Sequence, residues 1–244
     1  MTGTASGADD ASAPPRLDLW FVDLEANASD ISDCGRRLGL PTEPARSASS
    51  NAPAGDPQRI IAYLALRLLL ARSLGVDAAC QPFARESGGR PFLAGHALQF
   101  SLSHSGGHAL IALSHSSRIG VDLEFPRSLR MSGPRRTAIE DAGIAIGRGR
   151  GLSGATADAR TLMAWVRLEA AAKATGEGIG AILARLDARP GRVIPIPDGP
   201  SWPVAFDLVL PVPCHGAVAM FSAPTQQELT VAALDANTLA LFSV

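Results

Sequence analysis

Two acidic residues, Asp122 and Glu124, are the first candidates for chemistry in this chain of 244 residues. They stand in the segment Ile119-Gly-Val-Asp-Leu-Glu124, where apolar residues alternate with a glycine and the two acids. This alternation has the period of a half-buried β-strand, so both carboxylates are predicted to project from one face. Neighbouring carboxylates repel each other unless a cation lies between them, and oxygen ligands suit Mg²⁺. An isolated pair of this kind is more often a solvated strand face.

A carboxylate and an ammonium group follow on a predicted helix. The segment from Thr161 to Gly176 is rich in Ala and Leu, and its glycine is placed as a helix stop. Trp165, Glu169 and Lys173 are spaced four residues apart, which puts their side chains on one helix face. Taken alone, this pattern is more typical of a core tryptophan beside a surface Glu–Lys pair.

A third segment offers groups that can contact an anion. Residues 98–103 and 109–113 are predicted as strands, and His104-Ser-Gly-Gly-His108 falls within the turn that joins them. Hydroxyls, backbone N–H groups and an imidazole in such a turn can bind a phosphate. The segment lacks the Gly-x-Ser-x-Gly spacing and the following helix of a hydrolase nucleophile elbow. An ordinary hairpin turn is the alternative interpretation.

Taken in order, four segments resemble the 4′-phosphopantetheinyl transferase superfamily, in its larger, pseudo-dimeric type. They are Gly89-Arg-Pro-Phe92, Phe100-Ser-Leu-Ser-His-Ser-Gly106, Ile119-Gly-Val-Asp-Leu-Glu124 and Trp165-x-x-x-Glu-Ala-x-x-Lys173. Each motif alone is weak, but the ordered set is specific. The resemblance implies an α+β fold of two similar halves in a pseudo-twofold arrangement, with the ligand cleft between them.

The resemblance also implies a function. Members of this superfamily transfer 4′-phosphopantetheine from coenzyme A to a serine of an apo acyl or peptidyl carrier protein, release 3′,5′-ADP and use Mg²⁺. The expected enzyme is therefore a holo-[acyl-carrier-protein] synthase of fatty acid, polyketide or nonribosomal peptide biosynthesis. One alternative is a non-catalytic coenzyme A-binding relative. A less favoured alternative is a Mg²⁺-dependent phosphoester hydrolase.

The resemblance assigns roles by position. Asp122, Glu124 and Glu169 are the expected metal ligands. Glu169, Lys173 and His104 are the expected catalytic groups, with Glu169 as proton acceptor for the carrier serine. The residues expected to contact coenzyme A are Arg59, Arg90, Pro91, Phe92, Ser103, His104, Ser105, Gly106 and Lys173.

The sequence departs from the superfamily pattern directly before Glu169. A Lys or Arg usually stands there, and here the residue is Leu168, with Arg167 one position earlier. One position rotates a side chain by ~100° around a helix, so Arg167 is not an automatic substitute, although it is long enough to reach back. If position 168 faces the cleft, a Leu168→Lys variant is expected to lower the KM for coenzyme A.

Composition and charge limit the remaining possibilities. The net charge of −1 argues against a general nucleic-acid binder. Three widely spaced cysteines indicate a reducing compartment, and no run reaches the ~20 apolar residues of a membrane span. We therefore expect a cytoplasmic protein. We also expect a monomer, because a pseudo-dimer already supplies both halves of the cleft.

The expected organisation has three parts: a disordered N-terminus at 1–16, an N-terminal α+β half at 17–124 and a C-terminal α+β half at 125–244. A helix is predicted from Asp56-Pro57 to near Gly75, with Asp as the cap and Pro at the first helical position.

The stretch 126–154 is rich in arginine and glycine and is predicted to be a mobile basic loop. An alternative is that it docks an acidic carrier protein, since complementary charges raise association rates and selectivity. The arginines considered for that role are Arg135, Arg136, Arg148 and Arg150.

Overall fold

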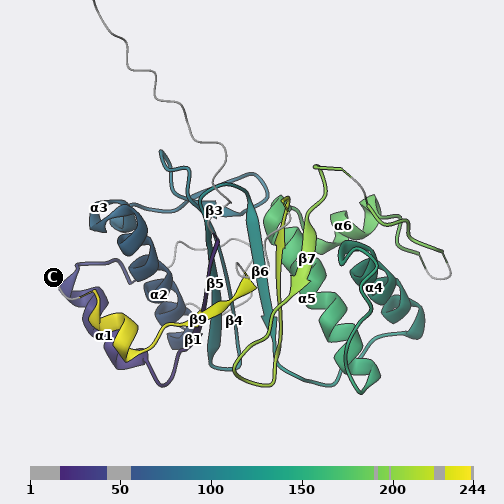
Figure 1. Ribbon diagram of the computed structural model, residues 1–244, viewed down its shortest axis with the longest axis horizontal. Coiled ribbons are helices and arrows are strands. Elements are labelled where there is room, and N and C mark those ends of the chain that lie inside the picture. The colour runs from purple at the N-terminus through teal and green to yellow at the C-terminus, as the bar shows by residue number, and fades with distance from the viewer. Residues whose placement is uncertain (1–16, 43–55, 190–191, 198, 223–228, 243–244) are drawn as a thin grey trace, which may run out of the picture.

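The structure is a computed structural model that describes residues 17–42, 56–189, 192–197, 199–222 and 229–242. Helices and several sheets are both present, so the predicted α+β class is confirmed (Figure 1). The twofold relation between the halves and the boundary at residue 125 stay predictions. The predicted disordered segment, 1–16, lies outside the described residues.

The strands form a first sheet in the order β4-β5-β1-β9, a small sheet β2-β3 and a third sheet β6-β8-β7. The strands are β1 (Leu17–Asp23), β2 (Ala84–Arg85), β3 (Pro91–Phe92), β4 (Gln99–Ser105), β5 (His108–Ser114), β6 (Ile119–Glu124), β7 (Val204–Asp207), β8 (His215–Met220) and β9 (Val231–Ala233). The helices are α1 (Ala28–Arg37), α2 (Pro57–Leu74), α3 (Val76–Cys80), α4 (Gly133–Ile146), α5 (Ala157–Thr175), α6 (Ile179–Arg185) and α7 (Ala236–Ala240).

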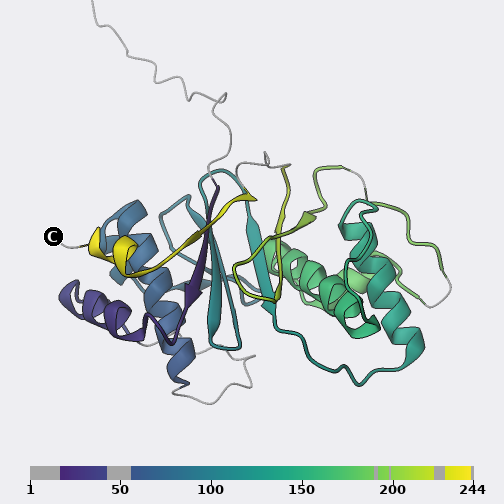
Figure 2. The ribbon, with the colours of Figure 1, turned by 60° about the horizontal axis from the view of Figure 1, so that its bottom comes forward.

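Four layers follow one another across the molecule: helices, sheet, sheet and helices (Figure 1, Figure 2). Because strand side chains alternate between faces, β1 and β5 bury one set of residues against α2 and the other set against the third sheet. Ile111 faces the α2 side, whereas Leu110 packs with Val121 and Val218 of the third sheet. The two halves therefore share an apolar cluster between their sheets, and each half has a further cluster of its own.

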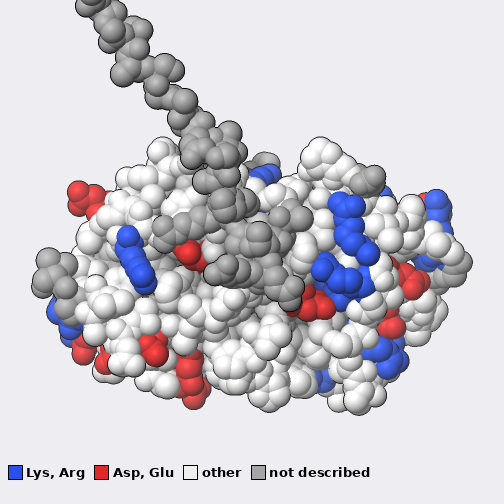
Figure 3. All heavy atoms as spheres, in the orientation of Figure 1, with Lys and Arg blue, Asp and Glu red and all other residues white. Residues whose placement is uncertain are grey.

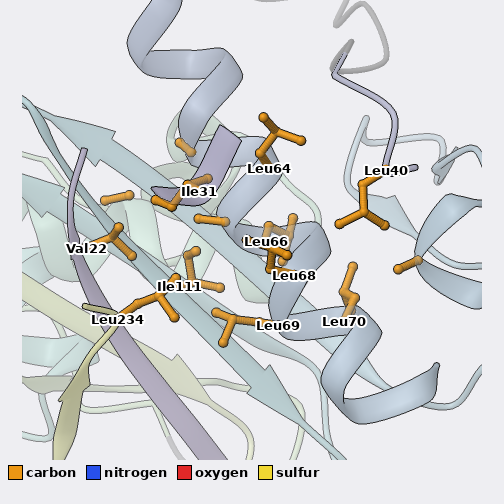
Figure 4. Close-up of a cluster of buried hydrophobic side chains, with 14 of the residues drawn as sticks. Val22, Ile31, Leu40, Leu64, Leu66, Leu68, Leu69, Leu70, Ile111 and Leu234 are labelled. Atoms are coloured by element: carbon orange, nitrogen blue, oxygen red, sulfur yellow. The ribbon is translucent and has the colours of Figure 1, made fainter. Parts of the chain in front are cut away.

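Helix α2 covers the outer face of the first sheet, and its ends lie where the sequence predicts them. Asp56 caps it by accepting a hydrogen bond from the Gln58 backbone N–H (3.1 Å), and Pro57 stands in the first turn. Gly75 follows the last helical residue with a φ of 89°. Figure 4 shows how buried leucines of α2 lie against Val22 and Ile111 of the sheet.

Helix α5 covers the third sheet and approaches β6 unusually closely. A Cβ at Gly120 would lie 2.0 Å from the carbonyl oxygen of Ala170, so only glycine permits this contact. Thr156 caps the helix by accepting a hydrogen bond from Ala159 N–H (3.1 Å), and Gly176 ends it in the left-handed conformation, as predicted.

The segment 126–154 is not a loop throughout, because residues 133–146 form helix α4. One side of this helix, with Ile139, Ala142 and Ile146, is buried against α5. The prediction of a loop is therefore wrong for this part. Ile139, Ala142 and Ile146 are spaced three and four residues apart, which is typical of a helix with one buried face. The many glycines and arginines of the segment led to the prediction of a loop instead.

The end of the chain returns to the first half. β9 pairs in parallel with β1, and the Leu234 backbone N–H donates to the Phe21 carbonyl (2.9 Å). Helix α7 then packs near α1, where Cys34 Sγ contacts the Leu239 carbonyl at 3.8 Å. Short segments of this kind carry no sequence signal for their partner. No helix in the described part of the chain has the length and apolar character needed to cross a membrane.

Arg167 joins three elements of the second half. Its side chain is 1% exposed, and its Nε and Nη2 atoms donate to the two carboxylate oxygens of Asp207 at 2.8 and 2.6 Å. The remaining N–H groups donate to the carbonyls of Gly143, Arg150 and Gly151. Arg167 therefore points into the interior of the second half and does not replace the missing cation at position 168.

We predict that Arg167→Ala lowers the free energy of unfolding by about 1–3 kcal/mol, because it leaves backbone carbonyls unsatisfied and removes the partner of Asp207, whose side chain is itself 34% exposed. Urea denaturation measures the effect. Arg160→Ala, on the same helix but half-buried, is the matched control and should cost less than about 1 kcal/mol. Equal stability of the two variants would contradict the structural role of Arg167.

Candidate active site

Asp122 lies in the predicted strand, β6, where it contacts both β4 and α5. We call this boundary between the halves the seam. Its side chain is 8% exposed, and its Oδ1 atom accepts hydrogen bonds from Ser103 Oγ of β4 (2.8 Å) and from Lys173 Nζ of α5 (2.7 Å). The other oxygen, Oδ2, is buried without a hydrogen-bond partner among the described residues. A buried carboxylate oxygen in this state is costly, so it is a candidate for a ligand contact.

The predicted spacing on α5 brings Glu169 and Lys173 to this seam. Lys173 Nζ also donates to the Val121 carbonyl (3.0 Å), so the ammonium group is held by both backbone and side chain of β6. The pKa of Glu169 is raised, first by its burial and then by the negative charges of Asp122 and Glu124, while Lys173 opposes the shift. Three carboxylates therefore influence one another here.

Glu124 does not join this seam directly. Its carboxylate is ion-paired with Arg127, with Nη2–Oε1 and Nε–Oε2 distances of 3.3 and 3.5 Å. Among the described residues, no group of three or more His, Cys, Asp or Glu side chains is placed to hold a metal ion. The predicted metal set of Asp122, Glu124 and Glu169 therefore stays a prediction.

A cavity of about 350 Å³ lies between the halves. Its walls come from α2, from the loop before β3, from β4 and from the end of α5 with the turn that follows. Four of the predicted site residues line it together: Arg90, Pro91, Glu169 and Lys173. Tyr63 and Leu66 of α2 close the opposite side.

Arg90 is the most informative group in this cavity. Its side chain is 5% exposed, and one nitrogen, Nη1, donates to Gln99 Oε1 (2.9 Å) and to Glu86 Oε1 (3.4 Å). The Nε and Nη2 atoms are buried and have no hydrogen-bond partner in the part of the chain that the structure describes. Burial lowers the pKa of Arg90, with Glu86 opposing the effect. A buried guanidinium with unpartnered N–H groups beside a cavity is a candidate for contact with an anion.

A close contact between the halves shapes this end of the cavity. A Cβ at Gly88 would lie 1.7 Å from the Gly176 carbonyl oxygen, so the loop before β3 rests directly on the end of α5. Arg118 stabilises the same contact. It forms an ion pair with Glu86 and donates a hydrogen bond to the Thr175 carbonyl (3.2 Å). Sequence reasoning missed Glu86 and Arg118, because nothing in their spacing indicates a contact across the halves.

The predicted anion-binding turn is tighter than expected. His104 and Ser105 belong to strand β4, and the turn consists of Gly106 and Gly107, with φ values of 55° and 78°. Two positive φ values in a two-residue turn suit glycine and match the twist of a hairpin. A Cβ at Gly106 would also meet the Phe125 ring at 2.7 Å.

His104 nevertheless belongs to the charged surroundings of the seam. Its pKa is lowered, mainly by burial, with Lys173 and Arg59 acting in the same direction and Asp56 opposing them. The imidazole is therefore neutral at neutral pH. The remaining predicted contacts, Arg59, Phe92, Ser103, Ser105 and Gly106, do not line the cavity that holds Arg90.

Leu168 does not face the cleft. Its side chain is fully buried in the second-half core, among residues of α4 and β8. The expectation that Leu168→Lys improves coenzyme A binding required a cleft-facing position, and the structure contradicts that condition. A lysine here would bury an ammonium group in an apolar core.

Comparison with known proteins adds independent information. No family model matches the chain. The chain is similar to the 4′-phosphopantetheinyl transferase HetI of Nostoc sp. (strain PCC 7120), with 29% identity over 212 residues that cover 83% of this chain and 86% of the relative. The similarity thus extends well beyond the four motifs and spans both halves. The ordered motifs and this similarity together support membership of the 4′-phosphopantetheinyl transferase superfamily.

Proposed function

We propose that this protein transfers 4′-phosphopantetheine from coenzyme A to a serine of an apo carrier protein, with release of 3′,5′-ADP and with Mg²⁺ as the metal ion. One observation carries the proposal. A single cavity between the halves is lined by an anion-receiving guanidinium, Arg90, by a carboxylate, Glu169, and by an ammonium group, Lys173. These are the groups that a serine, a diphosphate and a leaving nucleotide require.

Arg90 would bind a phosphate of coenzyme A. Its Nε and Nη2 groups have no acceptor among the described residues, so phosphate oxygens that reached them would recover the cost of their burial. Hydrogen bonds between a guanidinium and a phosphate are charge-assisted and often bidentate. Arg90 thus offers the cation that Leu168 does not.

Lys173 and His104 would act on the developing charge of the diphosphate. Lys173 carries a positive charge and is already held at Asp122, so little reordering is needed when the substrate binds. His104 is neutral at neutral pH because its pKa is lowered, and would contribute a hydrogen bond rather than a charge.

Glu169 would accept the proton of the carrier serine. The serine oxygen then forms a bond to the β-phosphorus of coenzyme A, and the bond from that phosphorus to the bridging oxygen breaks, releasing 3′,5′-ADP. The raised pKa of Glu169 brings the carboxylate closer to the working pH, which makes it a better base than an exposed glutamate.

The residues at the seam fit a divalent cation in part. Among the described residues, Asp122 Oδ2 is a buried oxygen without a hydrogen-bond partner. Burial is the first cause of the raised pKa of Glu169, and a cation would relieve the repulsion by Asp122 and Glu124 that adds to it. Mg²⁺, when bound, would supply positive charge to the phosphate oxygens. Glu124 could contribute only after separating from Arg127.

The direct test is incubation with coenzyme A, MgCl₂ and a panel of apo carrier proteins, followed by intact-mass measurement of each carrier. A gain of one phosphopantetheinyl group supports the proposal. Binding of coenzyme A without any mass gain on any carrier would favour the non-catalytic relative. Release of phosphate from a simple phosphoester would favour the hydrolase.

We predict that Asp122→Asn and Glu124→Gln each reduce transfer more than ~100-fold, because each removes a charged oxygen from the predicted metal set, which Glu124 would join after separating from Arg127. A second measurement reports metal binding without activity: MgCl₂ should raise the melting temperature of the wild type but not of the variants. Asp33→Asn, an exposed acid on α1, is the control. Wild-type rates at saturating Mg²⁺ would contradict the metal assignment.

We predict that Glu169→Gln abolishes transfer and stabilises the metal-free protein above neutral pH. The folded-state pKa of Glu169 is raised, so the stability that its protonated form provides is present below the unfolded-state pKa, about 4.3, and is lost as pH rises. Glutamine avoids that loss. The variant should therefore melt a few degrees higher than the wild type at pH 8, and the two should converge near pH 4.

Arg90→Gln should weaken coenzyme A binding about tenfold, the loss expected for a charge-assisted phosphate contact. Calorimetric titration of coenzyme A into the protein measures the dissociation constant. Arg36→Gln removes a distant exposed arginine and serves as the control. If Arg90→Gln binds coenzyme A as the wild type does, the unpartnered guanidinium has some other ligand.

A further inference from the structure

Three charged side chains gather beside Gly176, the residue that ends helix α5. A Cβ at Gly176 would lie 3.0 Å from Glu86 Oε2, 3.7 Å from Arg118 Nη2 and 3.8 Å from Arg90 Cβ. Glu86 and Arg90 lie in the loop that joins β2 and β3, and Arg118 directly precedes β6. We call Glu86, Arg90 and Arg118 the Glu86 cluster. It places two cations and one carboxylate at the end of the cavity where the halves meet.

The carboxylate of Glu86 is shared unequally between the two arginines. Its Oε2 atom is ion-paired with Arg118 Nη2, whereas its Oε1 atom is 3.4 Å from Arg90 Nη1. The second distance is long for a hydrogen bond, and Arg90 Nη1 has a closer acceptor in Gln99 Oε1 at 2.9 Å. Glu86 is therefore engaged mainly by Arg118.

Arg118 is itself held by the end of α5. Its Nη1 atom donates to the carbonyl of Thr175, the last helical residue, at 3.2 Å. The carbonyl end of a helix carries partial negative charge, so a cation is favoured there. Arg118 thus brings the carboxylate of Glu86 to the end of α5. Its side chain is 40% exposed, so the fold does not depend on burying it.

Arg90 keeps two donors for a ligand only while Glu86 is engaged elsewhere. Its Nε and Nη2 groups have no acceptor among the described residues, and a carboxylate can bind a guanidinium in bidentate fashion. The backbone keeps Glu86 within reach: its N–H donates to the Arg90 carbonyl at 3.0 Å, and its carbonyl accepts from Gly89 N–H at 2.8 Å. If Arg118 released Glu86, the carboxylate could occupy the donors that a phosphate needs.

The charges of the Glu86 cluster act strongly because one member is buried. Figure 3 shows basic and acidic side chains exposed next to one another on the right of the molecule, where water and salt screen them. Arg90 is only 5% exposed. Its pKa is lowered first by burial, while Glu86 opposes the shift and Arg118 adds to it. Glu86 therefore stabilises the cation at Arg90, and Arg118 offsets the negative charge that Glu86 places beside the anion site.

We propose that Arg118 is a positioning residue for coenzyme A, which holds Glu86 away from Arg90 and so keeps the Nε and Nη2 groups of Arg90 available to a phosphate. The inference rests on the proposed function and deepens it, because it names the residue that keeps the anion site open. The alternative is a purely structural role, in which Arg118 only attaches the loop before β3 to α5. The two roles differ in what happens when Glu86 loses its charge.

Titration calorimetry of coenzyme A into the protein tests this role through binding alone. Arg118→Gln should raise the dissociation constant about three- to tenfold, because a released carboxylate competes for a charge-assisted phosphate contact. Arg118→Lys should stay within about twofold of the wild type, because Arg118 contacts Glu86 through a single nitrogen and lysine keeps the charge. Arg36→Gln, which removes an exposed arginine of α1, is the control.

A second substitution separates positioning from a structural role. Glu86→Gln keeps an oxygen for Arg90 Nη1 and removes the competing charge, so Arg118→Gln/Glu86→Gln should bind coenzyme A as the wild type does. In an Arg90→Gln background, Arg118→Gln should have no further effect, because the donors that Glu86 would occupy are already absent. A structural role predicts the opposite: the pair Arg118→Gln/Glu86→Gln would bind no better than Arg118→Gln, and the losses from Arg118→Gln and Arg90→Gln would add.

Turnover and stability provide two further readouts. With a carrier that the wild type modifies, Arg118→Gln should raise the KM for coenzyme A by the factor seen in binding and leave kcat and the KM for the carrier unchanged. The variant should melt within about 2 °C of the wild type, because partly exposed ion pairs contribute little to stability. A large fall in melting temperature with an unchanged dissociation constant would identify a structural role.

The outcomes distinguish this inference from the proposed function. If the wild type binds coenzyme A but modifies no carrier, the proposed function fails, and the positioning role still stands or falls on the binding data. If the wild type modifies a carrier, and Arg118→Gln binds coenzyme A as tightly or Glu86→Gln fails to restore its binding, the positioning role is overturned while the function stands. If the wild type does not bind coenzyme A, both are overturned.

Discussion

The buried carboxylate of Asp122 connects the two halves of the molecule at the candidate active site. One oxygen accepts from Ser103 in the first half and from Lys173 in the second, so three elements, β4, β6 and α5, meet on a single atom. This meeting requires α5 to lie almost in contact with β6, which Gly120 permits. The cavity between the halves, the position of Glu169 and the orientation of Lys173 all follow from that approach.

Local signals in the sequence predicted the elements that build this seam. The alternation around Asp122, the cap at Asp56 and the stop at Gly176 each act within a few residues, so a single segment is enough to recognise them. Helix α4 was missed because its buried face, although regularly spaced, is interrupted by glycine and flanked by arginines. The joining of β9 to β1 depends on a partner more than two hundred residues away in sequence and has no local signal.

The site was predictable only where one element supplies several groups. Glu169 and Lys173 share a helix face, and their spacing brought them together as expected. The contact of Glu86 with Arg118 and the diversion of Glu124 to Arg127 are decided by tertiary packing, which spacing does not encode. Leu168 illustrates the same limit, because a rotation of ~100° from Glu169 was enough to move it from the cleft into the core.

Two buried arginines differ in how completely their hydrogen-bond donors are satisfied. This difference separates a structural charge from a charge that is a candidate for ligand binding. Arg167 is 1% exposed, and its five recorded hydrogen bonds engage every nitrogen of the guanidinium, so nothing further can bind it. Arg90 is 5% exposed but leaves two nitrogens without acceptors in a cavity wall. Leaving a buried donor unsatisfied costs about 1–3 kcal/mol, so the fold tolerates at Arg90 a penalty that it avoids at Arg167. Asp122 Oδ2 bears the same kind of penalty on the acidic side of the seam. An anion at Arg90 would remove the first penalty, and a cation at Asp122 would remove the second, so each unsatisfied group favours a ligand of opposite charge.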